Sequence, residues 1–350
     1  MSMMHMRGSG STGKHTGAHW RRGVHSWARV LLVACVLFAF LPSGCECVRR
    51  RGALLDRDTS DTPQDSVQKS VDVGGIERTF RVHVPPSYAA GTAVPLVFVL
   101  HGGGGEGEGM ERLTHMDEVA DSGGFIAVYP YGIDRNWNDG RPEINPSVDD
   151  VGFFRLMLDR LESDYSIDTR KVYSTGISNG GFMSYRLAFD LDGRIAAIAP
   201  VGAPMSEQQF ARPPPSSPVS VLLIHGVDDP LCPWSGGDLG FSRTGRGMDR
   251  GRCVSVADTI GYWVSADGCG AQPVKTDLPD ADPGDGTRVR EELYGGGRSG
   301  TDVELLAVEG GGHTWPGGLQ YLSERIIGRT NRDIDASSVI WEFFKSHSLD

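Results

Sequence analysis

The chain has 350 residues, enough for one large domain or two small ones, and its 39% share of apolar residues can support a hydrophobic core. Its net charge of −11 and the lack of a basic patch or basic helix argue against nucleic acid or another polyanion as a partner. No C-x-x-C pair occurs, so a structural zinc site is not expected, and we predict neither a metal centre nor a cofactor.

The first 44 residues have the composition of a secretory signal. They contain five basic residues and no acidic one, and the apolar run 30–41 is too short to span a bilayer comfortably. We therefore expect a signal peptide over 1–44 and a protein that is extracellular or in the cell envelope; the alternative is an uncleaved membrane anchor. The segment LPSGC, ending at Cys45, resembles a bacterial lipoprotein processing site, which would attach the protein to a membrane through lipid on Cys45. Residues 45–66 are polar and would form a flexible tether.

From Val67 onward, the pattern of apolar residues predicts strands that alternate with helices. A hairpin over 71–84 would turn at Gly74-Gly75, and the wholly apolar run 95–100 is typical of a strand buried on both faces of a parallel sheet. Further strands are expected over 124–129, 171–175, 195–201, 219–224, 288–293 and 303–308, and helices over 110–121, 149–165, 181–189, 255–266 and from Asp335 onward. This alternation predicts one α/β catalytic domain over 67–350, with a mostly parallel central sheet and helices on both faces.

The segment 176–180, Gly-Ile-Ser-Asn-Gly, matches the nucleophile elbow pattern G-x-S-x-G around Ser178. It follows an expected strand and precedes an expected helix, which is the context that this motif requires. Glycines suit such a tight turn, and the serine oxygen would lie at the positive end of the helix. Because 48 of the 350 residues are glycine, about half a match is expected by chance, and a Gly-rich turn is an equal alternative until other features are added.

A serine hydroxyl needs a base to remove its proton, and the base needs a carboxylate to orient it. In hydrolases with this strand order, the acid and the histidine follow later strands. The strand over 219–224 leads into Asp228 and Asp229, and the strand over 303–308 leads into a glycine-rich loop that holds His313. This order predicts that Ser178, His313 and one of the two aspartates are catalytic, while the other aspartate is a cap or turn former.

The oxyanion of the transition state needs hydrogen-bond donors. The backbone N–H of Asn179, next to the serine, is one candidate. The glycine loop 101–105, His-Gly-Gly-Gly-Gly, follows the strand over 95–100 and matches the lipase-type oxyanion loop. A phosphate-binding loop is the weaker alternative, because no Gly-Lys-Ser/Thr follows.

Together these segments resemble the poly(3-hydroxybutyrate) depolymerase-type esterases, which include feruloyl and acetylxylan esterases of carbohydrate esterase family one. The matching pieces are PLVFVLHGGGG, NWNDGR, KVYSTGISNGGFMSYRLA, HGVDDPLCPW and EGGGHTWPGG. The resemblance implies an α/β-hydrolase fold and ester hydrolysis through an acyl-enzyme. It also implies that Asp229, and not Asp228, is the catalytic acid, and that Gly103 supplies the second oxyanion donor.

The resemblance implies an ester substrate, either a polyester oligomer or an acylated plant polysaccharide. Feruloyl, acetyl and hydroxybutyrate esters all remain open. Trp137, Trp234 and Trp315 lie in or beside loops at the expected catalytic end and would form an aromatic wall for the substrate. Ordinary packing of large side chains is an equal alternative.

Three cysteines, an odd number, fall in the expected domain: Cys232, Cys253 and Cys269. One disulfide is expected in an oxidising compartment, with the third thiol left free or paired with Cys47. Two other functions compete with the esterase: a serine peptidase of the same fold, and a non-catalytic surface lipoprotein that acts as a binding module. The presence of all three catalytic residue types argues against the binding module.

Overall fold

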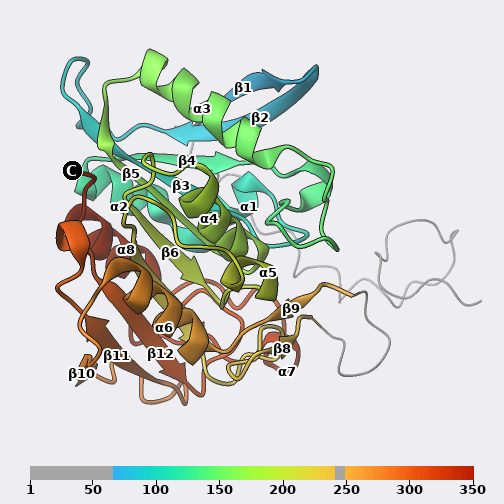
Figure 1. Ribbon diagram of the computed structural model, residues 1–350, viewed down its shortest axis with the longest axis vertical. Coiled ribbons are helices and arrows are strands. Elements are labelled where there is room, and N and C mark those ends of the chain that lie inside the picture. The colour runs from blue at the N-terminus through green and yellow to red at the C-terminus, as the bar shows by residue number, and fades with distance from the viewer. Residues whose placement is uncertain (1–65, 241–248) are drawn as a thin grey trace, which may run out of the picture. The chain divides into compact units, whose positions relative to one another are not determined.

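The structure, a computed structural model, describes residues 66–240 and 249–350. Its main feature is a 10-stranded sheet in the order β1-β2-β4-β3-β5-β6-β7-β12-β11-β10 (Figure 1). The six strands from β4 to β12 in this order are parallel to their neighbours, and antiparallel strands flank them on both sides. The strand bounds are β1 Val67–Val73, β2 Ile76–His83, β3 Val94–Leu100, β4 Ile126–Pro130, β5 Ile167–Ile177, β6 Ala197–Val201, β7 Ser220–Gly226, β10 Val274–Asp277, β11 Arg288–Tyr294 and β12 Val303–Glu309.

Helices cover both faces of the sheet. One face carries α3, α4 and α6, which lie toward the viewer in Figure 1, and the other carries α1, α2 and α8. The bounds are α1 Gly107–Thr114, α2 Met116–Gly123, α3 Asp150–Asp164, α4 Asn179–Asp190, α5 Glu207–Phe210, α6 Val256–Asp267, α7 Glu324–Ile327 and α8 Ala336–Lys345, with short 3₁₀ turns at Ile133–Arg135 and Arg298–Gly300.

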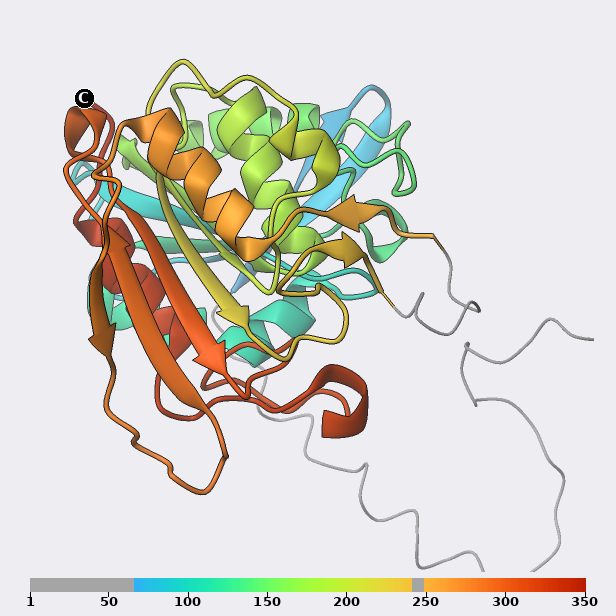
Figure 2. The same cartoon turned by 60° about the horizontal axis from the view of Figure 1, so that its bottom comes forward.

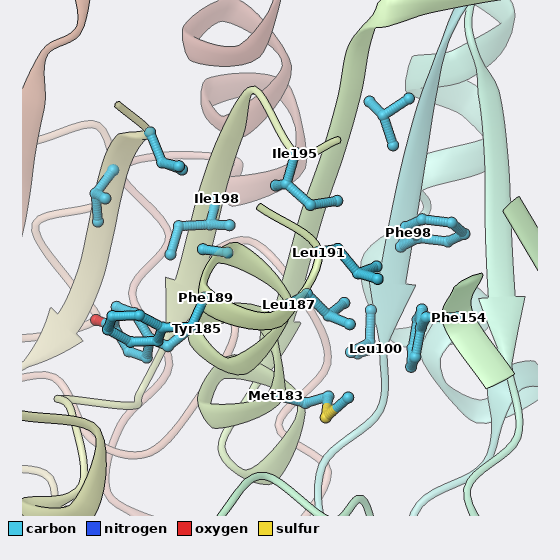
Figure 3. Packing of buried hydrophobic residues seen from close by; sticks show 14 of the residues in the cluster. Phe98, Leu100, Phe154, Met183, Tyr185, Leu187, Phe189, Leu191, Ile195 and Ile198 are labelled. Atoms are coloured by element: carbon cyan, nitrogen blue, oxygen red, sulfur yellow. The ribbon is translucent and has the colours of Figure 1, made fainter. Parts of the chain in front are cut away.

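The two-residue period of the central strands explains why both faces are covered. In β3, Leu96, Phe98 and Leu100 belong to the core under α3 and α4, whereas Val97 and Val99 belong to the core on the opposite face. Figure 3 shows Phe98 and Leu100 packed beside other side chains of the core under α3 and α4. A strand that is apolar on both sides needs cover on both sides, so helices must pack on each face.

The predicted fold class, an α/β-hydrolase with a mostly parallel sheet and helices on both faces, is confirmed. The predicted hairpin turns at Gly74-Gly75 as expected, and Asp149 caps α3 by accepting a hydrogen bond from the amide of Gly152. One prediction is wrong: the single helix expected over 110–121 is two helices. The chain breaks between α1 and α2 at His115, which has a φ of 50° and so cannot continue a right-handed helix.

A second, two-stranded sheet of β8 Gly237–Asp238 and β9 Arg252–Cys253 lies apart from the large sheet (Figure 2). A further bridge joins Cys253 to Ser206, which lies just beyond the end of β6. The segment between β7 and α6 is thereby fastened to the carboxyl end of the parallel strands.

Residues 1–65 lie outside the described residues. They include the expected signal peptide, the expected lipid anchor at Cys45 and all but the last residue of the expected tether. Among the described helices, none combines the length and the apolar character that a membrane crossing requires.

Candidate active site

Ser178 lies in the turn between β5 and α4, with a φ of 55° and a ψ of −122°. This region of backbone space is costly for any residue other than glycine, and such strain is concentrated at functional sites. The flanking glycines are required by sterics: a Cβ on Gly176 would lie 2.6 Å from the carbonyl oxygen of Leu100, and one on Gly180 would lie 2.4 Å from it. The end of β3 therefore packs directly against the elbow. Ser178 itself is only half-buried, in a buried segment.

Asp229 and His313 meet at the same edge of the sheet. Asp229 follows β7 and His313 follows β12, and these two strands are parallel neighbours. A hydrogen bond of 2.7 Å joins Nδ1 of His313 to Oδ2 of Asp229. The other carboxylate oxygen, Oδ1, accepts hydrogen bonds from the amides of Leu231 at 2.7 Å and Cys232 at 2.8 Å. Both oxygens of this buried carboxylate are thus hydrogen-bonded.

The electrostatics of the pair favour a charged aspartate. Burial by itself would raise the pKa of Asp229, but the nearby His313 and its hydrogen bond outweigh burial, so the pKa lies below its usual value. A carboxylate that stays ionised can hold the imidazole with Nδ1 protonated, which leaves Nε2 as the free base.

Gly202 connects this pair to the elbow. The amide of Ser178 donates to the carbonyl of Val201 at 2.9 Å, and Gly202 is the next residue. A Cβ on Gly202 would lie 3.2 Å from Nδ1 of His313 and 3.6 Å from Oδ2 of Asp229, so the imidazole lies against this glycine. Among the hydrogen bonds of the described residues, none joins the Ser178 hydroxyl to His313. The structure gathers the three predicted residues at one edge.

The glycine loop passes beside the elbow. A Cβ on Gly102 would lie 3.5 Å from Cβ of Ser178, and one on Gly103 would lie 3.8 Å from Cβ of Asn179. The amides of Gly103 and Asn179 donate no hydrogen bond within residues 66–240 and 249–350, whereas the amide of Gly104 is bound to the carbonyl of Arg135. Two backbone donors are therefore free next to the serine.

His101 fixes the shape of this loop. Its Nε2 accepts from the amide of Gly132 at 3.0 Å, so Nδ1 carries the proton and donates to the carbonyl of Gly102 at 2.8 Å. Burial lowers the pKa of His101 to about 4, which keeps the ring neutral and this tautomer in place. In the sequence, His101 is only the first residue of the glycine-loop motif. Its role in fixing the loop depends on its contacts with Gly102 and Gly132, which the sequence does not show.

With this geometry established, the similarity to known proteins can be judged. "Putative esterase NocK" of Nocardia uniformis subsp. tsuyamanensis is 33% identical to the chain over 286 residues, which span 79% of this chain and 81% of that protein. The chain belongs to the same esterase family. The family resemblance predicted from the motifs is confirmed, and the protein is a carboxylic-ester hydrolase.

Other similarities agree with this membership. "Probable feruloyl esterase C" of Aspergillus niger is 26% identical to the esterase over 274 residues, covering 76% of this chain and 83% of that one. The crystal structure of native pOPH superposes with a TM-score of 0.51 at 14% identity, covering 83% of this chain and 90% of that one, which shows the shared fold. No protein-family model matches the chain.

Two of the three tryptophans expected to line the substrate site of the esterase do not do so. Trp137 is fully buried and its indole nitrogen donates to the carbonyl of His101 at 2.8 Å. Trp315 is also fully buried, with its nitrogen bonded to Oγ of Ser337 at 3.1 Å. Both rings fill the interior because their polar nitrogens find partners there. Trp234 is half-buried and stays a candidate for substrate contact.

The side chain of Asn179 has a role that the motif did not reveal. It accepts from the amide of Trp137 at 2.7 Å and donates to the carbonyl of the same residue at 3.0 Å. It also donates to Oδ2 of Asp139 at 2.6 Å, and Asp139 forms a buried ion pair with Arg141. The first residue of α4 is therefore clamped to the segment after β4, which holds its backbone amide beside Ser178.

The cysteines of the described residues are all free thiols, so the expected disulfide is not formed among Cys232, Cys253 and Cys269. Its other expected partner, Cys47, lies outside the described residues. The ligand atoms of Asp229, Cys232 and His313 lie within 4.8 Å of one another, a grouping that could hold a metal ion. The aspartate and histidine already bind each other, and the arrangement suits proton relay.

Proposed function

We propose that this esterase works through a catalytic triad in which Ser178 is the nucleophile, His313 the general base and Asp229 the orienting acid. The observation that carries the proposal is the 2.7 Å hydrogen bond between His313 and Asp229 at the edge where Ser178 occupies a strained turn. With Nδ1 engaged by the carboxylate, Nε2 can accept the serine proton. Catalytic hydrogen bonds are often long in free enzymes and tighten when substrate binds, so we expect the serine–histidine contact to form with the ester in place.

The reaction then proceeds in two halves. Oγ of Ser178 attacks the acyl carbon while Nε2 of His313 takes its proton, and the amides of Gly103 and Asn179 donate to the oxyanion. His313 returns the proton to the alcohol oxygen as the acyl–oxygen bond breaks, which leaves an acyl-enzyme and releases the alcohol. Water attacks the acyl carbon by the same proton transfers and releases the acid.

The proposed substrate is a polyester oligomer or an acylated plant polysaccharide, as in the polyhydroxybutyrate depolymerase and feruloyl esterase types. Motifs around Ser178 and His313 support this class, as does the similarity to a protein named as a feruloyl esterase. We further propose export, by a signal peptide over 1–44 and with or without lipid on Cys45, because those residues have the composition of a signal. Rates on methyl ferulate, acetylated xylan and hydroxybutyrate oligomers distinguish the substrates.

Replacement of the nucleophile tests the triad. Ser178→Ala should lower kcat for p-nitrophenyl butyrate by about 10⁴-fold or more and abolish labelling by a fluorophosphonate probe. Ser265→Ala removes an exposed serine of α6 and should behave as wild type. Full activity in the Ser178 variant would refute the mechanism, and hydrolysis of peptides but not of esters by the wild type would favour a peptidase.

A further inference from the structure

Arg250 lies against the oxyanion loop. A Cβ placed on Gly103 would be 2.9 Å from Nη1 of Arg250, so the guanidinium lies beside the residue whose amide we assign to the oxyanion. The stem of Arg250 lies over Gly240, and its backbone carbonyl accepts a hydrogen bond from Nη1 of Arg141 at 2.7 Å. This last contact fixes the backbone of Arg250, while the half-buried side chain extends toward the reaction centre.

The guanidinium of Arg250 has no counter-ion within residues 66–240 and 249–350. No carboxylate there lies within ion-pair distance of it, and it donates no hydrogen bond to those residues. Asp139 attracts Arg250 from beyond ion-pair distance, but its carboxylate already binds Arg141 and Asn179. The carboxylate of Asp229 binds His313. Burial and the neighbouring positive charge of Arg141 lower the pKa of Arg250, although an arginine remains charged at any working pH. A partly buried guanidinium with no partner among the described residues can gain charge-assisted hydrogen bonds from an anion that reaches it.

A second unsatisfied group points to the same place. Oδ1 of Asn136 is buried, has no hydrogen-bond partner among the described residues, and would lie 3.0 Å from the same Cβ position on Gly103. The amide nitrogen of this side chain is already used, because it donates to the carbonyl of Asp134 at 2.7 Å. Buried polar atoms normally find a partner, so a free acceptor beside a free cation indicates a place that a polar ligand group completes.

We propose that Arg250 determines specificity by binding a carboxylate carried by the ester that reacts at Ser178. Arginine binds carboxylates with two parallel hydrogen bonds. The geometry matches this chemistry because the guanidinium lies beside Gly103, and the preceding residue, Gly102, lies beside Ser178. The oxygen of Asn136 would accept from a hydroxyl of the same substrate. Short hydroxy-acid oligomers with a free acid end have both groups, whereas acetyl and feruloyl esters have no carboxylate. The proposal rests on the proposed function in that it takes Ser178 as the nucleophile.

Two matched pairs of esters test this assignment and locate the carboxylate. On the alcohol side, the 3-hydroxybutyrate dimer is compared with its methyl ester; on the acyl side, mono-p-nitrophenyl glutarate is compared with p-nitrophenyl valerate. For each pair the quantity measured is kcat/KM for the acid divided by kcat/KM for the neutral ester. In Arg250→Gln this ratio should fall at least tenfold for one pair, mainly through a higher KM, and that pair identifies the side. Arg250→Lys should recover part of the ratio.

Arg155→Gln is the control, because it removes the same charge from an exposed position on α3 and should leave both ratios unchanged. Ratios that stay at the wild-type value on both pairs in Arg250→Gln would overturn the proposal. This includes an equal fall in kcat/KM for both members of each pair, which leaves the ratios unchanged. Arg250 would then act on the reacting carbonyl or on the fold. If the glutamine variant does not fold, the lysine variant is measured on the same pairs, and an unchanged ratio overturns the proposal. A wild type inactive on all four esters would instead refute the proposed function.

Discussion

At the residue scale, Asp228 and Asp229 are neighbours with the same chemistry and different surroundings. Asp229 is buried, holds His313 and accepts two backbone amides, whereas Asp228 is exposed. The pKa of Asp229 lies below its usual value because the contacts with His313 outweigh the effect of burial, which alone would raise it. Only one of the two aspartates can therefore orient the imidazole.

Neutralising each aspartate in turn should separate their roles. Asp229→Asn should lower kcat for p-nitrophenyl butyrate by about 10³- to 10⁴-fold, because an amide opposite Nδ1 favours the wrong tautomer of His313. An asparagine oxygen can still accept from the amides of Leu231 and Cys232, so the thermal midpoint should change little. Asp228→Asn is the matched control, with near wild-type kcat expected. A large loss in the Asp228 variant alone would reverse the assignment.

The sequence sufficed to predict which residues lie together at the carboxyl edge of the sheet. Ser178, Asp229 and His313 each follow an apolar run, and parallel strands bring such positions to one edge. The roles of Gly202 and the Asn179 side chain were out of reach, because they depend on contacts between segments far apart in the chain. For Trp315 the sequence left substrate contact and packing equally open, because a position two residues from His313 does not say whether the ring faces solvent or the core.

At the element scale, hydrophobic pattern and turn residues identified the buried strands and most helices. The elements that sequence reasoning missed have little such pattern. All four residues of β10 are exposed, so the strand shows no alternation, and α5 is a single turn held by a capping box at Ser206. The break between α1 and α2 has no proline or glycine to announce it, since the left-handed residue is His115.

The end of α6 contains a buried carboxyl group with consequences for stability. Oδ1 of Asp267 accepts from the amide of Val219 at 3.2 Å, while Oδ2 is buried with no partner among the described residues. Burial raises the pKa of Asp267 from 3.8 to about 7. Between these values the folded state keeps a proton that the unfolded state has lost. The contribution of Asp267 to the free energy of unfolding therefore falls as the pH rises from about 4 to about 7, and this contribution changes no further above that range.

Removing this charge should remove the pH dependence that it causes. We expect Asp267→Asn to match wild type near pH 4 and to exceed its free energy of unfolding at pH 8 by on the order of 2–4 kcal/mol, because asparagine has no charge to bury. Urea denaturation at pH 4, 6 and 8 gives the free energy of unfolding at each pH, and hence its slope against pH. Asp277→Asn removes an exposed carboxylate of β10 and should keep the wild-type slope. A wild-type slope in the Asp267 variant would show that its carboxyl is ionised throughout this range.

At the scale of the whole molecule, a small apolar cluster ties the segment after β7 to the main body. It contains Phe182 of α4, Ala203 after β6, and Cys232, Leu239 and Cys253 of the segment itself. The same segment carries Asp229 at its start and Arg250 near its end. If the cluster opens only when the whole domain unfolds, the site is rigid; if it opens alone, the site can rearrange without unfolding.

Thiol labelling distinguishes the two cases. Burial raises the pKa of the Cys253 thiol to about 12 and that of Cys232 well above its usual value. Both cysteines are therefore protected from a thiol reagent, because it cannot reach them and because little reactive thiolate forms. We expect N-ethylmaleimide, with peptide mapping by mass spectrometry, to modify half-buried Cys269 first. Cys232 and Cys253 should react together, with the urea dependence of global unfolding seen by circular dichroism. Labelling of either at urea concentrations that leave the dichroism unchanged, or a linked Cys232–Cys253 peptide, would contradict this prediction. The first outcome would mean that the segment after β7 opens locally while the rest of the domain stays folded.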